Sequence, residues 1–254
     1  MPCNDDLSEV YWVVLDVDGV LIDVRRSYDL AVMKTVEHFA EDRGSLAGLT
    51  LDSIRELRRR GLFGNDFQVS EALIASLSDG PPEDFVSSFP SDRGIQWVRK
   101  RYPCPTSPEE VRHFFNTVYL GRKYSERLFD CRGLWREEEV LVETDLLHRL
   151  DQRGPLGVIT GRSELELSLA EDLLGFEFNH AVTREWKVKP DPACLRVLVG
   201  PPELEPFGVY IGDTLNDQKL VENFRAGGAD FGFLMVGRDV EDVNQALLRL
   251  VDDD

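Results

Sequence analysis

Three short apolar runs, each followed by a polar glycine turn, constrain the fold of this chain more than any other feature of its sequence. Residues 11–15, 157–160 and 208–211 are rich in β-branched and aromatic side chains and have the length of strands. Similar runs occupy residues 231–236 and 180–183. The sequence therefore predicts up to five strands, three of which end in turns that carry polar groups.

Helical patterns follow three of these runs, at residues 164–174, 218–226 and 240–251. Strand, turn and helix in succession are typical of βαβ units, which build a parallel sheet with helices on both faces. In such sheets ligands bind at the carboxyl ends of the strands. We therefore predict an α/β fold with its site at the edge where the polar turns lie.

Charge divides the chain into two parts. The whole chain has 254 residues, 29 basic and 47 acidic, and a formal net charge of −18. Residues 24–136 hold 18 of the basic and 16 of the acidic side chains. Helical spacing recurs in this stretch at residues 28–41, 53–60, 69–77 and 108–120, with no strand pattern. The prediction is a core of residues 1–23 and 137–254, interrupted by a helical domain at 24–136.

The acidic balance also limits the partners of the chain. A negative field disfavours nucleic acid and anionic membranes as partners, and the apolar runs are far too short to span a bilayer. Residues 1–9 show no basic segment leading into an apolar one, so no secretory signal is expected. Four scattered cysteines form no CxxC pair and predict free thiols: Cys3, Cys104, Cys131 and Cys194. We expect a cytoplasmic protein, either a monomer or a homodimer.

Two aspartates follow the first strand, two residues apart. Alternation along an extended chain aims the side chains of Asp16 and Asp18 the same way, towards the sheet edge. Two such carboxylates repel each other unless a cation or a shared proton lies between them. On its own this Asp-x-Asp-Gly pattern is a weak signal, because plain turns also contain it.

Later turns add complementary groups. Thr160 ends the second strand, and its hydroxyl with the backbone amides that follow predicts an anion cradle. Lys189 offers a compact positive charge, and Asp213 and Asp217 flank the turn after the third strand. Together these turns provide carboxylates for a hard divalent cation, and a hydroxyl and an ammonium for a phosphoryl group.

This series of turns resembles the haloacid dehalogenase (HAD) superfamily, subfamily I, whose members include phosphoglycolate phosphatases. Residues 16–20 resemble its first motif, Thr160 its second, Lys189 its third and residues 212–217 its fourth. An insert between the first and second motifs is typical of the C1-capped members. The resemblance implies a Rossmann-like HAD core with a parallel sheet, and an inserted helical C1 cap domain.

The resemblance also implies a mechanism. Asp16 would be the nucleophile that forms an aspartyl-phosphate intermediate, and Asp18 would protonate the leaving alcohol and then deprotonate water. Thr160 and Lys189 would bind the phosphoryl oxygens. Lys187 competes for the third-motif role, but the lysine directly before proline fits the family better.

The same resemblance implies Mg²⁺ as the cofactor. Asp16, the backbone carbonyl of Asp18 and Asp213 would hold the ion. Asp217 would act just outside it, on water bound to the metal or on Lys189. Dehalogenases lack an acid at the position of Asp18, so its presence favours phosphoester chemistry.

The expected function is a Mg²⁺-dependent phosphatase that acts on a small phosphorylated metabolite. Gly161, Arg162, Arg25 and Arg26 are the further residues expected to bind the substrate. A phosphomutase of the same superfamily is the alternative enzyme, because it shares the nucleophile and the acid. A binding protein without catalysis, built on the same core, is a third reading.

Overall fold

The structure, a computed structural model, describes residues 11–40, 45–91, 93–103, 106–204 and 206–252. The chain divides into two units. One, called here the core unit, joins Met1–Asp23 to Glu139–Asp254, and the other, called here the helical unit, is Val24–Glu138.

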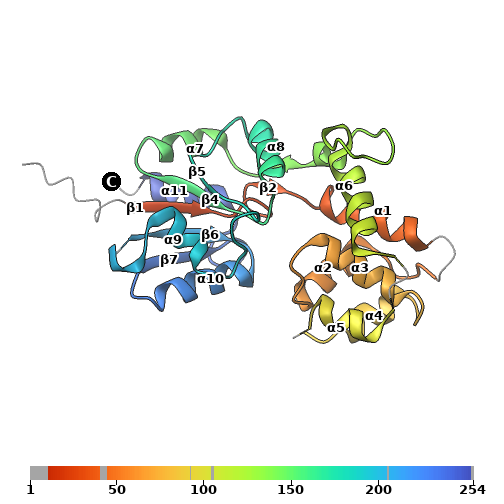
Figure 1. Cartoon of the computed structure of the whole chain (residues 1–254). Coiled ribbons are helices and arrows are strands. Elements are labelled where there is room, and N and C mark those ends of the chain that lie inside the picture. Colours follow the sequence, from red (N-terminus) through yellow and green to blue (C-terminus); the bar gives the residue numbers. More distant parts are fainter. Residues whose placement is uncertain (1–10, 41–44, 92, 104–105, 205, 253–254) are drawn as a thin grey trace, which may run out of the picture. The chain divides into compact units, whose positions relative to one another are not determined.

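The core unit is built on a sheet of five parallel strands in the order β5-β4-β1-β6-β7 (Figure 1). The strands are β1 (Tyr11–Leu15), β4 (Leu156–Ile159), β5 (His180–Val182), β6 (Phe207–Gly212) and β7 (Asp230–Met235). All five lie within one residue or so of the runs expected from the sequence. The prediction of an α/β fold with a parallel sheet is confirmed.

Chain order reverses beside β1, because the chain first adds β4 and β5 on one side and then β6 and β7 on the other. Leu15 at the end of β1 pairs with Val158 of β4 and with Ile211 of β6. The ends of these three strands therefore meet at the point of reversal, which is where ligands bind in open α/β sheets.

Helices cover both faces of the sheet, as Figure 1 shows, with α9 and α10 on one face and α7, α8 and α11 on the other. Their bounds are α7 (Thr144–Asp151), α8 (Glu164–Leu174), α9 (Ala193–Val199), α10 (Leu215–Arg225) and α11 (Val243–Asp252). On the first face Val14, Tyr210 and Phe231 of the strands form a fully buried cluster with Leu195 of α9 and Phe224 of α10. Burial of such side chains supplies most of the driving force for folding.

Two helices of the core unit begin at capping boxes. Ser163 caps α8 with Glu166, and Thr214 caps α10 with Asp217. The cap at Thr214 starts α10 at Leu215, three residues earlier than the apolar pattern suggested. Helices α7 and α9 were not expected, because eight and seven residues are too few to show a clear helical period.

A short antiparallel pair also belongs to the core unit. Strand β2 (Ile22–Asp23) pairs with β3 (Glu139–Val140), so the two ends of the inserted segment leave the core side by side. Neither strand was predicted, because two residues carry no pattern.

The helical unit contains α1 (Tyr28–Ala40), α2 (Leu51–Arg60), α3 (Asp66–Ser76), α4 (Pro82–Ser88), α5 (Ile95–Arg101) and α6 (Pro108–Leu120). Two short 3₁₀ helices follow, at Gly121–Lys123 and Leu134–Glu137. No strand occurs among the residues described in this unit, in keeping with the all-helical prediction. Helices α4 and α5 were not predicted, since both have seven residues and lie beside prolines or glycine.

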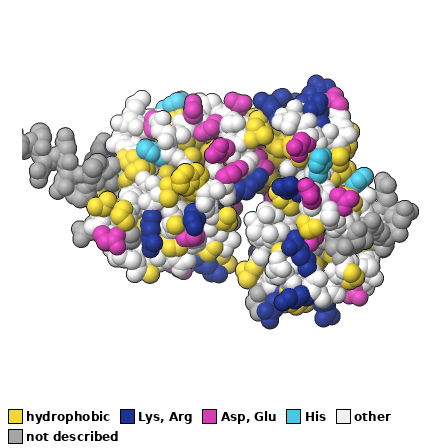
Figure 2. All heavy atoms as spheres, viewed as in Figure 1, with side chains coloured by type: hydrophobic (Ala, Val, Ile, Leu, Met, Phe, Trp, Pro, Cys, Tyr) yellow, Lys and Arg dark blue, Asp and Glu magenta, His cyan; other side chains and the backbone are white. Residues whose placement is uncertain are grey.

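Aromatic stacking and buried ion pairs hold the helical unit together. The ring of Tyr28 in α1 stacks on Tyr119 of α6 with 4.4 Å between centroids. Asp29 is buried and binds Arg55 at 2.6 Å and Arg58 at 2.7 Å. Lys and Arg side chains lie among Asp and Glu on the visible surface of this unit (Figure 2).

Of the four cysteines, Cys131 and Cys194 carry free thiols, as expected. Cys3 and Cys104 lie outside the described residues. Among the helices that the structure describes, none has the length and apolar character needed to cross a membrane.

Candidate active site

Three strand ends bring the predicted site residues of the core unit to one edge of the sheet. Asp16 follows β1, and its amide donates to the carbonyl of Ile211 in β6 at 2.9 Å. Thr160 follows β4, and its amide donates to the carbonyl of Val182 in β5 at 2.9 Å. Asp213 follows β6. Backbone pairing thus fixes each residue at the carboxyl edge.

Lys189 lies at the centre of this edge. Its ammonium is 2.7 Å from Oδ2 of Asp16 and 2.7 Å from Oδ1 of Asp217. Burial disfavours the charged lysine, but the two carboxylates outweigh it and raise the pKa of Lys189 above its ordinary value. Lys187 is half exposed and pairs with Asp191 at 3.5 Å instead. Geometry therefore brings Lys189, and not Lys187, to Asp16.

Asp217 is fully buried, and both of its carboxylate oxygens accept hydrogen bonds. Its Oδ1 accepts from Lys189 and, at 3.1 Å, from the Tyr210 hydroxyl, and its Oδ2 accepts from the Thr214 amide at 3.0 Å and the Thr214 hydroxyl. Burial opposes ionisation, yet the Lys189 charge and these hydrogen bonds lower the pKa of Asp217. Asp217 therefore holds Lys189 in place.

Asp16, Asp213 and Asp217 form the acidic cluster of the site, with one carboxylate oxygen from each lying within 4.8 Å of the others. Burial raises the pKa of Asp16 well above its ordinary value, an effect that Lys189 opposes and the neighbouring carboxylates reinforce. Burial and the charge of Asp217 raise the pKa of Asp213 to about 7. Three crowded carboxylates carry more negative charge than one lysine neutralises.

The residues present fit a divalent cation. Oδ1 of Asp213 is buried and has no hydrogen-bond partner among the described residues. An orphaned buried carboxylate oxygen is costly unless something binds it. Oxygen donors of this kind suit Mg²⁺.

Gly19 shows how closely the first turn packs on the fourth motif. A Cβ atom at this position would lie 2.1 Å from Oδ2 of Asp213, and the backbone has φ +78°. Both the left-handed conformation and the close approach require glycine here.

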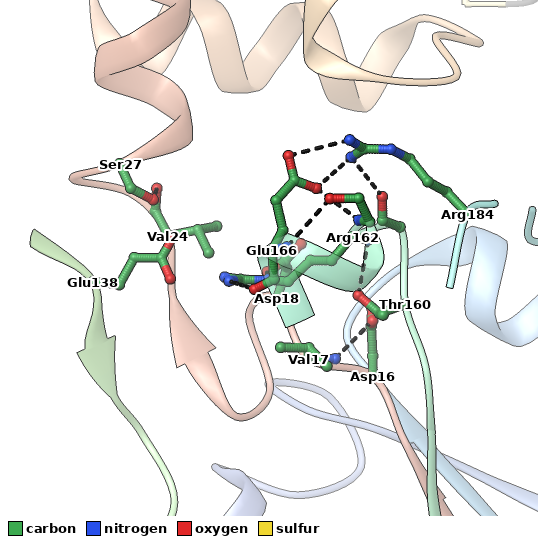
Figure 3. A network of polar contacts seen from close by, with 12 residues as sticks. Asp16, Val17, Asp18, Val24, Ser27, Glu138, Thr160, Arg162, Glu166 and Arg184 are labelled. Carbon is green, nitrogen blue, oxygen red and sulfur yellow. Dashed lines mark hydrogen bonds and ion pairs between the residues drawn. The ribbon is translucent and has the colours of Figure 1, made fainter. Parts of the chain in front are cut away.

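Asp18 takes a partner that the sequence did not predict. Its Oδ1 accepts from Nε of Arg162 at 2.7 Å (Figure 3), and the Asp18 side chain is 30% exposed. Arg162 is fully buried. The sequence predicts a substrate contact for Arg162, which stays a prediction, and the structure shows its guanidinium bound to Asp18.

The turn after β4 is held by internal hydrogen bonds. The amide of Arg162 donates to the Thr160 hydroxyl oxygen at 3.1 Å, and the amide of Ser163 donates to Glu166 at 2.7 Å. The sequence predicts that the amides after Thr160 bind an anion. The amides of Arg162 and Ser163 already donate hydrogen bonds to protein oxygens. Beside Gly161 the space is open, since a Cβ atom there would meet nothing within 4 Å.

Three residues around these turns were not predicted from the sequence. Tyr210 binds Asp217, and Glu166 and Arg184 pair with each other beside Gly161 (Figure 3). Only Glu166 had a readable signal, its place three residues after Ser163 in a capping box. Arg25 and Arg26 belong to the helical unit, where both are exposed, and their assignment to substrate remains a prediction.

Comparison with known proteins places the fold. A HAD-superfamily hydrolase of subfamily IA from Geobacter sulfurreducens superposes with a TM-score of 0.50 at 17% identity, covering 99% of this chain and 100% of the other. Phosphatase Tt82 from Thermococcus thioreducens superposes with a TM-score of 0.86 at 49% identity, covering 96% of this chain and 100% of the other. The chain belongs to the same family as this phosphatase and has the fold of the HAD superfamily. The resemblance seen in its motifs is thereby confirmed.

One curated relative differs in name and in length. An imidazoleglycerol-phosphate dehydratase from Phytophthora nicotianae is 26% identical in an alignment 242 residues long that covers 89% of this chain. The chain spans only 44% of the length of that relative. No protein-family model matches the chain.

Proposed function

We propose that this HAD-superfamily chain is a Mg²⁺-dependent phosphatase that hydrolyses a small phosphomonoester through an aspartyl-phosphate intermediate. The observation that carries the proposal is the position of Asp16, buried at the strand ends and 2.7 Å from the ammonium of Lys189. An acid at Asp18 and the acidic cluster complete the groups that this reaction needs. The high identity to a phosphatase supports the same activity.

Asp16 is oriented for attack. Its Oδ1 accepts from the Val17 amide at 2.8 Å and its Oδ2 accepts from Lys189, so the side chain is held at both ends. One carboxylate oxygen attacks phosphorus, the bond from phosphorus to the ester oxygen breaks, and the leaving alkoxide takes a proton from Asp18. Water then attacks phosphorus, gives its proton to Asp18, and releases inorganic phosphate and the Asp16 carboxylate.

Asp16, Asp213 and the backbone carbonyl of Asp18 would hold Mg²⁺, while Asp217 positions Lys189. When bound, the ion adds positive charge that offsets the repulsion between carboxylates and phosphoryl oxygens. Lys189 and the hydroxyl of Thr160 bind the phosphoryl oxygens and stabilise the charge of the transition state. The open space beside Gly161 leaves room for one of these oxygens.

The curated relative bears on the kind of alcohol that is released. Its name describes an enzyme that acts on a phosphomonoester carrying an imidazole ring. We therefore include phosphomonoesters of imidazole-bearing alcohols among the small metabolites proposed as substrates.

Phosphate release from a panel of phosphomonoesters tests the proposal. The panel holds sugar phosphates, phosphoglycolate, nucleotides and imidazole-bearing alcohol phosphates, each with Mg²⁺ and with EDTA. We expect metal-dependent release that is lost in Asp16→Asn. The control is Asp191→Asn, which removes a carboxylate from the loop of Lys189 and should retain activity.

Each other outcome identifies an alternative. Isomerisation of an ester without free phosphate would favour a phosphomutase. No turnover by the folded, Mg²⁺-loaded protein would favour a binding protein on the same core.

A further inference from the structure

Arg162 is the largest side chain among the described residues that are fully buried. A buried guanidinium is costly unless a counter-charge and hydrogen bonds compensate it. Asp18 provides the charge, through the 2.7 Å bond from Nε of Arg162, and the carbonyl of Glu166 accepts from Nη1 at 3.2 Å. The proposed acid and base of the reaction is thus hydrogen-bonded to a buried cation.

Arg162 itself is firmly anchored. Its amide donates to Thr160, and its carbonyl accepts from the amide of Arg184 at 3.0 Å. The guanidinium of Arg184 pairs with Glu166 and donates to the carbonyl of Gly161 at 3.2 Å. Hydrogen bonds within the turn after β4 and hydrogen bonds from Arg184 therefore hold this turn, and they fix the position of Arg162 (Figure 3).

The backbone of Asp18 is bridged to Ile22, but its side chain is held less firmly. It stands in the turn after β1, its side chain is 30% exposed, and a carboxylate on a short side chain has several rotamers open to it. The bond from Arg162 joins this carboxylate to the turn that carries Thr160, although Asp18 and Arg162 are 144 positions apart in the sequence.

We propose that Arg162 is a positioning residue, which holds the Asp18 carboxyl group where it can transfer a proton to the leaving oxygen. This inference rests on the proposed function and assigns Arg162 a role other than substrate binding. Arg162 binds one oxygen of Asp18 through Nε, so the other oxygen can serve the reaction. Proton transfer depends on such placement, since donor and acceptor must come within hydrogen-bond reach.

Dependence on the leaving group separates positioning of an acid from a general structural role. An alkoxide needs a proton as the ester bond breaks, whereas 4-nitrophenolate is stable enough to leave without one. The value of kcat/KM reports the steps up to departure of the alcohol, before water attacks the intermediate. Loss of a well-placed acid should therefore lower kcat/KM for an alkyl phosphate far more than for 4-nitrophenyl phosphate.

The experiment compares kcat/KM on these two esters for three variants, after circular dichroism has checked that each is folded. Arg162→Met should lose about 100-fold on the alkyl ester and about threefold on the aryl ester, within the usual range for general acid catalysis. Arg162→Lys restores a donor and should recover part of the alkyl rate. Arg184→Gln removes a guanidinium that follows β5 and contacts this turn without contacting Asp18, so the ratio of the two rates should match that of the unmodified protein.

Equal losses on both esters in Arg162→Met and Arg162→Lys, with the unmodified protein active, would overturn the positioning role alone. A rise in KM with unchanged kcat in Arg162→Met would also overturn the positioning role, and would favour substrate binding by Arg162. Absence of turnover of either ester by the unmodified protein would overturn the proposed function, and this inference with it.

Discussion

The ammonium of Lys189 lies 2.7 Å from the carboxylate of Asp16, in a position where both groups are largely buried. The loop that follows β5 and the turn that follows β1 meet at this contact. Asp217, the second partner of Lys189, belongs to α10, and its carboxylate also lies 2.7 Å from the ammonium. One cation therefore ties together three segments of the core unit.

Replacing Lys189 with methionine should destabilise the protein in a pH-dependent way. The pKa of Asp217 is lowered in the folded protein, so its ionised form stabilises the fold above the ordinary carboxyl pKa. That contribution is lost as pH falls through the folded pKa. Without Lys189 the buried carboxylates are uncompensated, and we expect a loss of about 3–5 kcal/mol at neutral pH.

This loss should shrink towards about pH 5, as the carboxylates of the variant become protonated. Urea unfolding in EDTA at both pH values measures it. Lys187→Met is the matched control, since it removes a half-exposed ion pair worth about 0.5 kcal/mol or less. A loss that stays constant or grows on acidification would contradict the role given to Lys189.

Gly19→Ala should abolish activity while the chain stays folded. The new Cβ atom would be placed 2.1 Å from Oδ2 of Asp213 and would displace that carboxylate. Gly237→Ala is the control, because its φ of +79° imposes the same backbone strain with nothing within 4 Å of the added atom. Both should lose about 1–2 kcal/mol of stability, the usual cost of a left-handed conformation. Equal activity in the two variants would refute the packing of Gly19 on Asp213.

Asp29→Asn should loosen the helical unit. Asp29 is buried and binds both Arg55 and Arg58, so its neutralisation leaves two guanidinium groups without their shared charge. We expect about 3 kcal/mol less protection from hydrogen exchange in α2 and α3. Asp52→Asn, which removes the 92%-exposed partner of Arg55, should change protection by about 0.5 kcal/mol or less. Similar effects in the two variants would contradict this account.

The fold was predictable where local chemistry marks an element. Residues 11–15 form β1 as expected, because an apolar run meets a polar turn at Asp16. Ser163 and Glu166 mark the start of α8 in the same way. Short elements such as α4, α5, α7 and α9 escaped prediction, since one or two helical turns give no clear period.

The candidate site was predictable as a set of residues but not as a network of contacts. Sequence order alone brings Asp16 and Asp213 to one edge, because both follow parallel strands. The bond between Asp18 and Arg162 depends on β1 and β4 being neighbours, and no local pattern reveals it. The sequence predicts Tyr210 only as one apolar residue of a strand, although its hydroxyl binds Asp217.

Trapping the covalent intermediate tests the central claim most directly. Asp18→Asn should slow attack by water, so acid-quenched protein should carry one phosphoryl group after incubation with 4-nitrophenyl phosphate and Mg²⁺. Mass spectrometry of its peptides should place that group on Asp16, and Asp16→Asn should carry none. A phosphoryl group on another residue, or turnover by Asp16→Asn at the rate of the unmodified protein, would contradict the account.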